Sequence, residues 1–186
     1  MALIPSVMKE LGTVAAAFAL PDVVSGRIVS SEEYRRKDAF LVVFMCAHCP
    51  YVKHVEKEIA NIGLDYAEEN VGIVAISSNY VASYPDDAPE KLKEQAERLG
   101  FNFPYLYDES QQVARGYGAV CTPDFFLFDE DMKLAYRGQL DGSRPGNTVP
   151  SNGKDLRAAI TSLVAGRMPS EDQKPSIGCN IKWKPI

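Results

Sequence analysis

Positive charge is in short supply in this sequence. Its 186 residues include 20 lysines and arginines against 25 aspartates and glutamates, which gives a formal net charge of −5. The longest basic run covers only residues 35–37, which is too short to hold a phosphate backbone or an anionic bilayer. We therefore expect neither nucleic acid nor a membrane surface as a partner.

Long apolar runs are also lacking. No segment approaches the ~18–20 apolar residues that a membrane-spanning helix requires. The apolar stretch 13–20 follows Lys9 and Glu10 rather than a basic cluster, and no small-x-small cleavage site follows it. We therefore expect residues 1–20 to be the first piece of the fold rather than a signal peptide, and the protein to be cytoplasmic.

Repeats and low-complexity segments are absent, and the composition is that of one soluble globular domain, with 46% apolar and 24% charged residues. A chain of this length buries ~70% of its unfolded surface, so it needs no disulfide or metal in order to fold. Cytosolic thiols are kept reduced. We therefore expect the four cysteines to be reactive or metal-binding rather than a structural framework.

Residues 40–76 have the pattern of a β–α–β unit. Residues 40–45 and 71–76 are continuous apolar runs, typical of parallel strands that are buried on both faces. Between them, apolar residues recur every three or four positions, as on one face of an amphipathic helix. This stripe consists of Val52, Val55, Ile59, Ile62 and Tyr66. The residues expected on the solvent side are Lys53, Glu56, Lys57 and Glu58.

Two further helices are predicted after the second strand. One covers residues 89–99, with Asp87 and Glu90 as a reciprocal capping pair and Gly100 at its C-terminus. A shorter helix is expected over residues 110–118.

The second half of the chain predicts a hairpin and a last helix. Residues 124–129 and 133–137 form the two strands of an antiparallel hairpin, because turn residues separate two apolar runs. Residues 141–153 are expected to be a loop. The last helix begins near Leu156 and ends at Gly166.

This order, β–α–β–α–α–β–β–α, predicts an α/β fold with three layers, in which helices cover both faces of a mixed sheet. An N-terminal hairpin is expected over residues 23–29. We expect one domain over residues 1–166 and a C-terminal extension, residues 167–186, that packs on it. Apolar residues alternate between Ile177 and Trp183, which indicates a short docked strand in this tail.

Cys46 and Cys49 lie where the first strand is expected to end and the helix to begin. Free N–H groups and the dipole at a helix start stabilise a thiolate and lower a thiol pKa from ~8.5 to ~3.5–7.5. The position predicts Cys46 as an exposed nucleophile and Cys49 as the thiol that resolves a mixed disulfide. The spacing alone is weak evidence.

His48 stands between the two cysteines. An imidazole that is cationic or hydrogen-bonded beside Cys46 favours the thiolate and makes the disulfide a stronger oxidant. The alternative is an exposed turn residue with no redox role.

These residues, together with Thr122-Pro123 just before the strand at 124–129, resemble the thioredoxin-like superfamily. The chain is similar in particular to a bacterial subgroup of the alkyl hydroperoxide reductase/thiol-specific antioxidant (peroxiredoxin-type, AhpC/TSA) proteins, whose members are described as thiol-disulfide isomerases or thioredoxins. The stretches that carry the resemblance are residues 43–53, 84–87, 103–109, 122–123 and 177–183.

The resemblance implies a thioredoxin-like fold with Cys46 as nucleophile, Cys49 as resolving thiol and Pro123 in the cis form. In such a fold the backbone of Thr122 lies beside the cysteines, where it is free to pair with an extended substrate segment. The residues alone leave open a trans proline that begins a strand.

The sequence departs from the thioredoxin pattern at two places. Thioredoxins place a buried carboxylate in the strand beneath the active site, but no Asp or Glu occurs between Asp38 and Cys46. A water, His48 or a residue from another segment must then accept the proton of the resolving thiol. In addition, Met45 stands where a tryptophan commonly precedes the first cysteine.

The peroxiredoxin pattern is also incomplete, because no threonine occurs from Val14 to Cys121. That threonine and an arginine normally orient the peroxide. The sequence does not place Arg115, Arg137 or Arg144 at the site. Fast peroxide reduction is therefore disfavoured.

Two further cysteines have open roles. Cys121 directly precedes Thr122-Pro123, so it is an additional redox thiol, a soft metal ligand or a small buried filler. Cys179 lies in the apolar alternation of the tail and is expected to pack there. A Cys121–Cys179 bridge is one of three possible pairings of four cysteines and stays open.

The function indicated by the sequence is a thiol–disulfide oxidoreductase. It would act on protein or small-molecule disulfides, be re-reduced by an external dithiol such as a thioredoxin system, and need no cofactor and no metal. The first alternative is a thiol-dependent peroxidase, whose cysteine passes through sulfenic acid. The second is a module that binds Cu(I) or Zn(II) through Cys46, Cys49, Cys121 and either His48 or His54.

Overall fold

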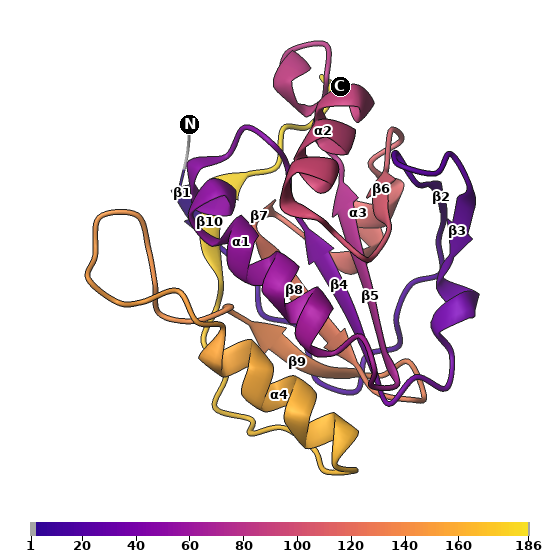
Figure 1. The fold of residues 1–186 in the computed structure, drawn as a ribbon, viewed down its shortest axis with the longest axis vertical. Coiled ribbons are helices and arrows are strands. Elements are labelled where there is room, and N and C mark those ends of the chain that lie inside the picture. Colours follow the sequence, from indigo (N-terminus) through magenta and orange to yellow (C-terminus); the bar gives the residue numbers. More distant parts are fainter. Residues whose placement is uncertain (1–2, 186) are drawn as a thin grey trace.

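A five-stranded mixed sheet forms the centre of the fold (Figure 1). The computed structural model describes residues 3–185, and its strands run in the order β6-β5-β4-β8-β9. Strands β4, β5 and β6 are parallel, whereas β8 is antiparallel to β4 and β9 is antiparallel to β8. The bounds are Ala39–Phe44 (β4), Val71–Ser77 (β5), Tyr105–Tyr107 (β6), Asp124–Phe128 (β8) and Leu134–Gly138 (β9).

Strand β4 lies in the middle of this sheet, and all six of its residues are buried. Because successive side chains of a strand point to opposite faces, its apolar run is divided between two cores. Leu41 and Val43 belong to one core, whereas Phe40, Val42 and Phe44 belong to the other. The run is continuous because both faces of the strand are covered.

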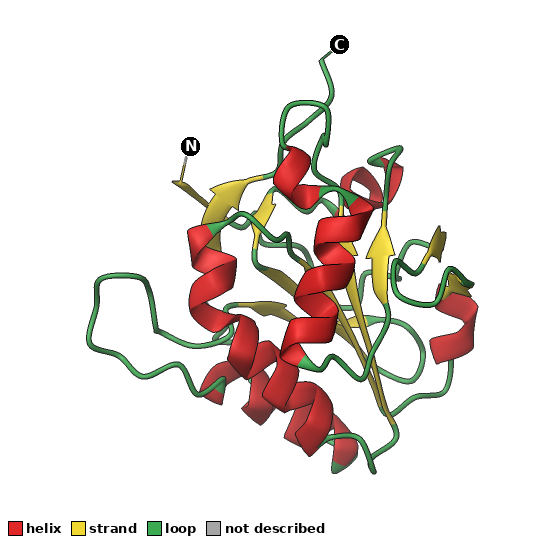
Figure 2. Cartoon of the chain, turned by 45° about the horizontal axis from the view of Figure 1, so that its top comes forward, coloured by secondary structure: helices red, strands yellow, loops and turns green. Residues whose placement is uncertain are grey.

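Three helices contribute to the core on one face of the sheet (Figure 2). They are α1 (Pro50–Asp65), α2 (Pro89–Leu99) and α4 (Lys154–Val164). The apolar stripe predicted for the first of them is confirmed, since Val52, Val55 and Ile59 are buried against the sheet. No helix in residues 3–185 is both long and apolar enough to cross a membrane.

The opposite face is covered by α3 (Gln112–Tyr117) and by the N-terminal part of the chain. The expected N-terminal hairpin is formed by β2 (Ala19–Pro21) and β3 (Ile28–Ser30), followed by the 3₁₀ turn Ser31–Tyr34. The mixed α/β fold with three layers is therefore confirmed.

A second, smaller sheet brings the two ends of the described chain together. It consists of β1 (Leu3–Pro5), β10 (Ile177–Asn180) and β7 (Cys121–Thr122), in the order β1-β10-β7. Both pairings are antiparallel. The short strand expected in the tail is present, and it lies between the N-terminal strand and the segment that precedes Pro123.

Two local expectations are wrong. The N-cap of α2 is Ala88, with no side-chain cap, because Asp87 accepts hydrogen bonds from the backbone of residues 47 and 48 instead. Glu56 is not on the solvent side of α1. It is buried, where it accepts a hydrogen bond from Gln95 and pairs with Arg98.

The edge strand β6 was not expected from the sequence. Its three residues, Tyr105–Tyr107, are too few to show an alternation, and they pair with β5 in parallel. The strand extends the parallel part of the sheet beneath α2.

Candidate active site

The two cysteines of the candidate site lie between β4, which ends at Phe44, and α1, which begins at Pro50. Cys49 is the N-cap residue of α1, in an extended backbone conformation, and its carbonyl accepts the hydrogen bond of Lys53. Pro50 occupies the first helical position, where a fixed φ and a missing N–H favour a helix start. The sequence therefore ends the strand and starts the helix around the pair, as predicted.

The structure brings the sulfur atoms of the pair together beside Thr122. Cys46 Sγ lies 3.7 Å from His48 Nδ1 and 3.6 Å from Thr122 Oγ1. Cys49 Sγ lies 3.3 Å from the carbonyl oxygen of Thr122. The two thiols also shift each other's pKa. The Thr122–Pro123 peptide bond is cis.

Both cysteines are fully buried, with 0% of each residue exposed. The expectation that Cys46 is exposed is therefore wrong. The reason is that Thr122 covers this sulfur from β7 while the imidazole of His48 covers it from its own turn. A substrate reaches the pair only when part of this cover moves.

The two thiols titrate as a pair that shares protons. Burial and the hydrogen bond with Cys49 raise the pKa of Cys46 well above its usual value. Hydrogen bonds from Cys46, Cys179 and the backbone of Val52 overcome burial and lower the pKa of Cys49 to about 4. These directions favour a resting charge on Cys49. The carbonyl of Thr122 favours the neutral form of Cys49 instead, because it accepts a hydrogen bond from the Cys49 thiol when that thiol is protonated.

His48 is held by an aspartate that the sequence analysis assigned to a helix cap. Asp87 Oδ2 lies 2.5 Å from His48 Nδ1, and Asp87 Oδ1 accepts the backbone N–H groups of Ala47 and His48 at 2.9 and 3.0 Å. The ring of Tyr84 stacks on the imidazole at 5.2 Å. The side chain of His48 is only 12% exposed, so the exposed-turn alternative is wrong.

Asp87 is fully buried and carries a charge. Burial raises its pKa, but hydrogen bonds from His48 and from Asn79, at 2.8 Å, outweigh burial and leave the pKa below its usual value. This carboxylate in turn raises the pKa of Cys46. It is thus a buried acid from another segment, but it acts on His48 and Cys46 rather than on the resolving thiol, for which the sequence left a proton acceptor open. The resemblance included residues 84–87, which was the available signal.

The backbone of Thr122 is not free for a substrate, contrary to expectation. Strand β10 pairs with it, and Cys179 lies opposite Thr122 in the register. The thiol of Cys179 lies in the same buried cluster as Cys49 and lowers its pKa. Cys121 instead directs its sulfur toward the carbonyl of Pro123, at 3.9 Å, and burial raises its pKa. All four cysteines are free thiols.

With this geometry established, comparison with known proteins gives the family. Residues 11–137 match the sequence model of the AhpC/TSA family. The chain belongs to the AhpC/TSA family. A relative from Geobacillus thermodenitrificans, named thiol-disulfide oxidoreductase ResA, is 31% identical over 126 residues, which cover 67% of this chain and 66% of that relative. The family places this chain among thiol-disulfide oxidoreductases and peroxiredoxins.

Solved structures agree with the fold of this AhpC/TSA protein. A crystal structure of a conserved protein from Geobacillus kaustophilus is 50% identical, with a TM-score of 0.98, and the match covers 100% of this chain and 98% of that one. A Neisseria meningitidis protein named as a thioredoxin is 24% identical, with a TM-score of 0.61, over 80% of this chain and 88% of that one. The fold is therefore thioredoxin-like.

The three arginines considered for this AhpC/TSA protein are engaged away from Cys46. Arg137 is buried in the sheet, where it forms a bidentate pair with Asp124 and stacks on Phe126. Arg115 lies over the ring of Trp183. Arg144 donates to Gln139 and to backbone carbonyls of its own loop. None of these three is placed to orient a peroxide at the pair.

Some residues of the metal-binding alternative do lie together. Ligand atoms of Cys46, His48 and Asp87 lie within 4.8 Å of one another, and such sulfur, nitrogen and oxygen donors suit Zn(II). However, His48 Nδ1 and Asp87 already bind each other, so a metal would have to break that pair. Cys121 faces Pro123, and His54 lies 2.7 Å from Ser143 Oγ, so neither joins the cluster.

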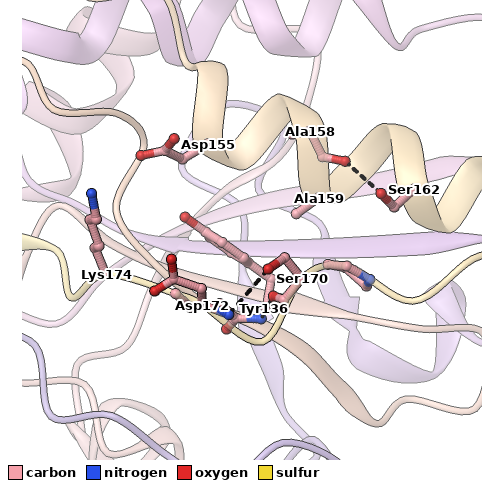
Figure 3. Close-up of a pocket in the computed structure, with 10 residues that line it drawn as sticks. Tyr136, Asp155, Ala158, Ala159, Ser162, Ser170, Asp172 and Lys174 are labelled. Atoms are coloured by element: carbon pink, nitrogen blue, oxygen red, sulfur yellow. Dashed lines mark hydrogen bonds between the residues drawn. The ribbon is translucent and has the colours of Figure 1, made fainter.

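A surface cleft of about 310 Å³ lies elsewhere, between α4, β9 and residues 169–174. Figure 3 shows Asp155 at the start of α4 and the side chains of Asp172 and Lys174 on the tail segment beside it. No cysteine lines this cleft. It is therefore separate from the thiol chemistry.

Proposed function

We propose that the protein is a thiol–disulfide oxidoreductase in which Cys46 and Cys49 form the redox couple. The observation that carries this proposal is the pair itself: two free thiols that both lie against Thr122 at the start of α1, one of them with a pKa of about 4. A thiolate is the form of cysteine that attacks a disulfide. The substrates are protein or small-molecule disulfides, and no cofactor is needed.

Proton exchange between the two neighbouring thiols supplies the nucleophile. Cys46 passes its proton to the Cys49 thiolate and attacks one sulfur of the substrate disulfide, which forms a mixed disulfide and releases the first substrate thiolate. Cys49 then loses its proton to that thiolate and attacks Cys46 Sγ, which releases the second thiolate. The substrate gains two electrons and the protein gains a Cys46–Cys49 disulfide.

His48 and Asp87 assist the first of these steps. The carboxylate of Asp87 fixes the orientation of the imidazole. The Nδ1 atom of this ring lies 3.7 Å from Cys46 Sγ, beside the place where the thiolate forms. Thr122 Oγ1, at 3.6 Å, donates a further hydrogen bond.

An external dithiol such as a thioredoxin system closes the cycle by reducing the Cys46–Cys49 disulfide. We place the protein in the cytoplasm, where such dithiol systems keep thiols reduced.

Disulfide reduction by cysteine variants tests the proposal. Cys46→Ser should abolish the reduction of insulin disulfides, and Cys49→Ser should accumulate mixed disulfides at Cys46, seen as added mass in non-reducing mass spectrometry. Cys121→Ser is the matched control and should keep wild-type activity, since its sulfur faces the Pro123 carbonyl. Wild-type rates in Cys46→Ser would falsify the assignment.

The second candidate is a thiol-dependent peroxidase, which membership of the AhpC/TSA family favours. The lack of the family threonine and the positions of Arg115, Arg137 and Arg144 count against it. Peroxide consumption and insulin reduction, measured on the same sample with the same thioredoxin system, separate the two. Faster turnover of peroxide than of disulfide would favour the peroxidase.

A further inference from the structure

We propose that Cys179 is a third redox thiol, which exchanges with the Cys46–Cys49 disulfide to form a Cys49–Cys179 disulfide. This inference rests on the proposed function, because the first disulfide must form before it can be exchanged. It assigns chemistry to the C-terminal tail, which the sequence analysis expected only to pack.

The position of Cys179 follows from the register of the small sheet. Cys179 lies opposite Thr122 across β10 and β7, and the carbonyl of Thr122 lies 3.3 Å from Cys49 Sγ. Cys46, Cys49 and Cys179 are buried in the same core cluster, and the side chain of Thr122, opposite Cys179, lies 3.6 Å from Cys46 Sγ. Cys49 therefore has two neighbouring thiols, either of which is a partner for it.

The C-terminal tail is part of the site, because it pairs and hydrogen-bonds with the segments around the cysteines. Strand β10 pairs with β1 on one side and β7 on the other. Ser176 Oγ donates to the carbonyl of Pro123 at 2.7 Å, and the backbone N–H of Lys182 donates to Asn79 Oδ1 at 2.8 Å. A Cβ at Gly178 would meet the carbonyl oxygen of Thr122 at 1.9 Å. Only glycine allows this approach, which brings the next residue, Cys179, to the pair.

Oxidation of the pair changes the environment of Cys179. In the reduced protein, burial and the hydrogen bond and charge of Cys49 raise the pKa of Cys179 to about 12. When Cys49 enters a disulfide it carries no charge, so that contribution is lost and the pKa of Cys179 falls. Burial, the largest cause of the raised pKa, remains.

The exchange conserves electrons and needs no further oxidant. Cys179 Sγ loses its proton and attacks Cys49 Sγ. The Cys49–Cys179 bond forms, the Cys46–Cys49 bond breaks, and Cys46 leaves as a thiolate that takes up the released proton. One disulfide remains in the molecule, now between α1 and β10, and the nucleophile Cys46 is free again.

Thiol mapping in the full-length protein tests whether Cys49 and Cys179 can form the product disulfide of this exchange. Cys46→Ser, treated with oxidised dithiothreitol, quenched with acid and digested, should lose two thiols and give a peptide linked through Cys49 and Cys179. The matched control, Cys46→Ser/Cys179→Ala, should keep its thiols, because Cys121 faces away toward Pro123. A Cys46→Ser protein that keeps all its thiols, or that links Cys49 to Cys121, overturns the proposal.

The wild-type protein gives a second measurement that does not depend on the folding of Cys46→Ser. After oxidation and acid quench, a fraction of molecules should be alkylated at Cys46, and Cys179→Ala should remove that fraction. If Cys179 is always alkylated and Cys46 never is, the inference fails. Insulin reduction by the same wild-type sample reports on the proposed function separately, so the two failures are distinguishable.

Discussion

Cys49 is the residue on which the hydrogen-bond donors of the site converge. The thiols of Cys46 and Cys179 and the backbone of Val52 all lower its pKa. The sequence predicted that the two sulfurs of the motif lie together, and it assigned the charge to Cys46. It could not include the effects of Cys179 and Asp87, because both reach the site from segments far along the chain and no pattern near the motif indicates them.

The charge on Cys49 predicts the pH dependence of the reduced protein. The thiolate absorbance at 240 nm should persist as the pH falls from 9 and disappear with a midpoint of about 4. Because this pKa is lower than the usual value of 9.0, the native protein binds fewer protons than the unfolded chain between these limits. Its contribution to stability is therefore complete above pH 9 and is lost as the pH falls toward 4.

Cys46→Ala provides the matched variant for this titration. It removes the largest contribution to the low pKa of Cys49, the hydrogen bond from Cys46, so the midpoint should move to higher pH. An unchanged midpoint, or a wild-type midpoint near 9, would contradict the assignment of the charge.

Asp87→Asn should weaken the interaction with His48 and lower the stability of the fold. The amide cannot pair as an anion with His48, and hydrogen bonds to a charged group contribute about 1.5–3 kcal/mol. We expect a loss of that size in the free energy of unfolding, measured in urea at pH 7. Because the native pKa of Asp87 is lowered, its contribution is present above the usual value of 3.8 and is lost as the pH falls below it.

The same variant should lower the pKa of Cys46, since the charge of Asp87 raises it. The rate of iodoacetamide alkylation against pH, read at Cys46 by peptide mapping, measures this shift. Asp86→Asn, at an exposed neighbour, is the control and should change neither stability nor alkylation. A pKa of Cys46 that stays the same in Asp87→Asn would show that the carboxylate does not act on the thiol.

At the scale of elements, the sequence predicted the helices and strands whose formation depends mainly on neighbouring residues. The β–α–β unit followed from apolar periodicity, and α1 begins at Pro50 as its sequence indicates. Strands β6 and β7 were missed because they are three and two residues long and depend on their partners. The prediction that Asp87 caps a helix is wrong for a related reason. Its carboxylate accepts hydrogen bonds from backbone N–H groups of residues 47 and 48, which are distant in sequence, rather than from the start of α2.

Gly178→Ala should separate β10 from β7. The added Cβ would lie 1.9 Å from the carbonyl oxygen of Thr122, and overpacking of this kind costs about 1–3 kcal/mol. We expect a loss of stability of at least that size in urea unfolding. Gly142→Ala is the control, because its Cβ would meet only Val149 at an ordinary 3.7 Å. Equal stability of the two variants would show that β10 is not held against Thr122.

At the scale of the whole molecule, strands from the two ends of the described chain pair with each other beside the site. Strand β10 joins β1 to β7 beside the thiols, and the fully buried Arg137–Asp124 pair lies directly beyond Pro123. The sequence predicted a docked tail but not its partners, because this pairing connects segments from the start, middle and end of the chain. A buried ion pair between neighbouring strands leaves no periodic pattern either.

This arrangement predicts that the tail unfolds together with the body of the protein. Trp183 is the single tryptophan, and its ring packs under the guanidinium of Arg115 at 4.3 Å, so fluorescence excited at 295 nm reports on the tail. Far-UV circular dichroism reports on the sheet and helices. Because β10 has a strand on both sides, the two signals should follow one urea transition with a common midpoint.

An earlier fluorescence transition would show that the tail opens before the rest, which contradicts a cooperative tail. The two cases also differ in how the buried thiols become accessible. If the tail is cooperative, the reaction of native protein with a bulky disulfide reagent must proceed through movement of the turn that carries His48, whose side chain is 12% exposed. Its rate should then respond to Tyr84→Ala, which removes the ring stacked on His48, and remain unchanged in low urea.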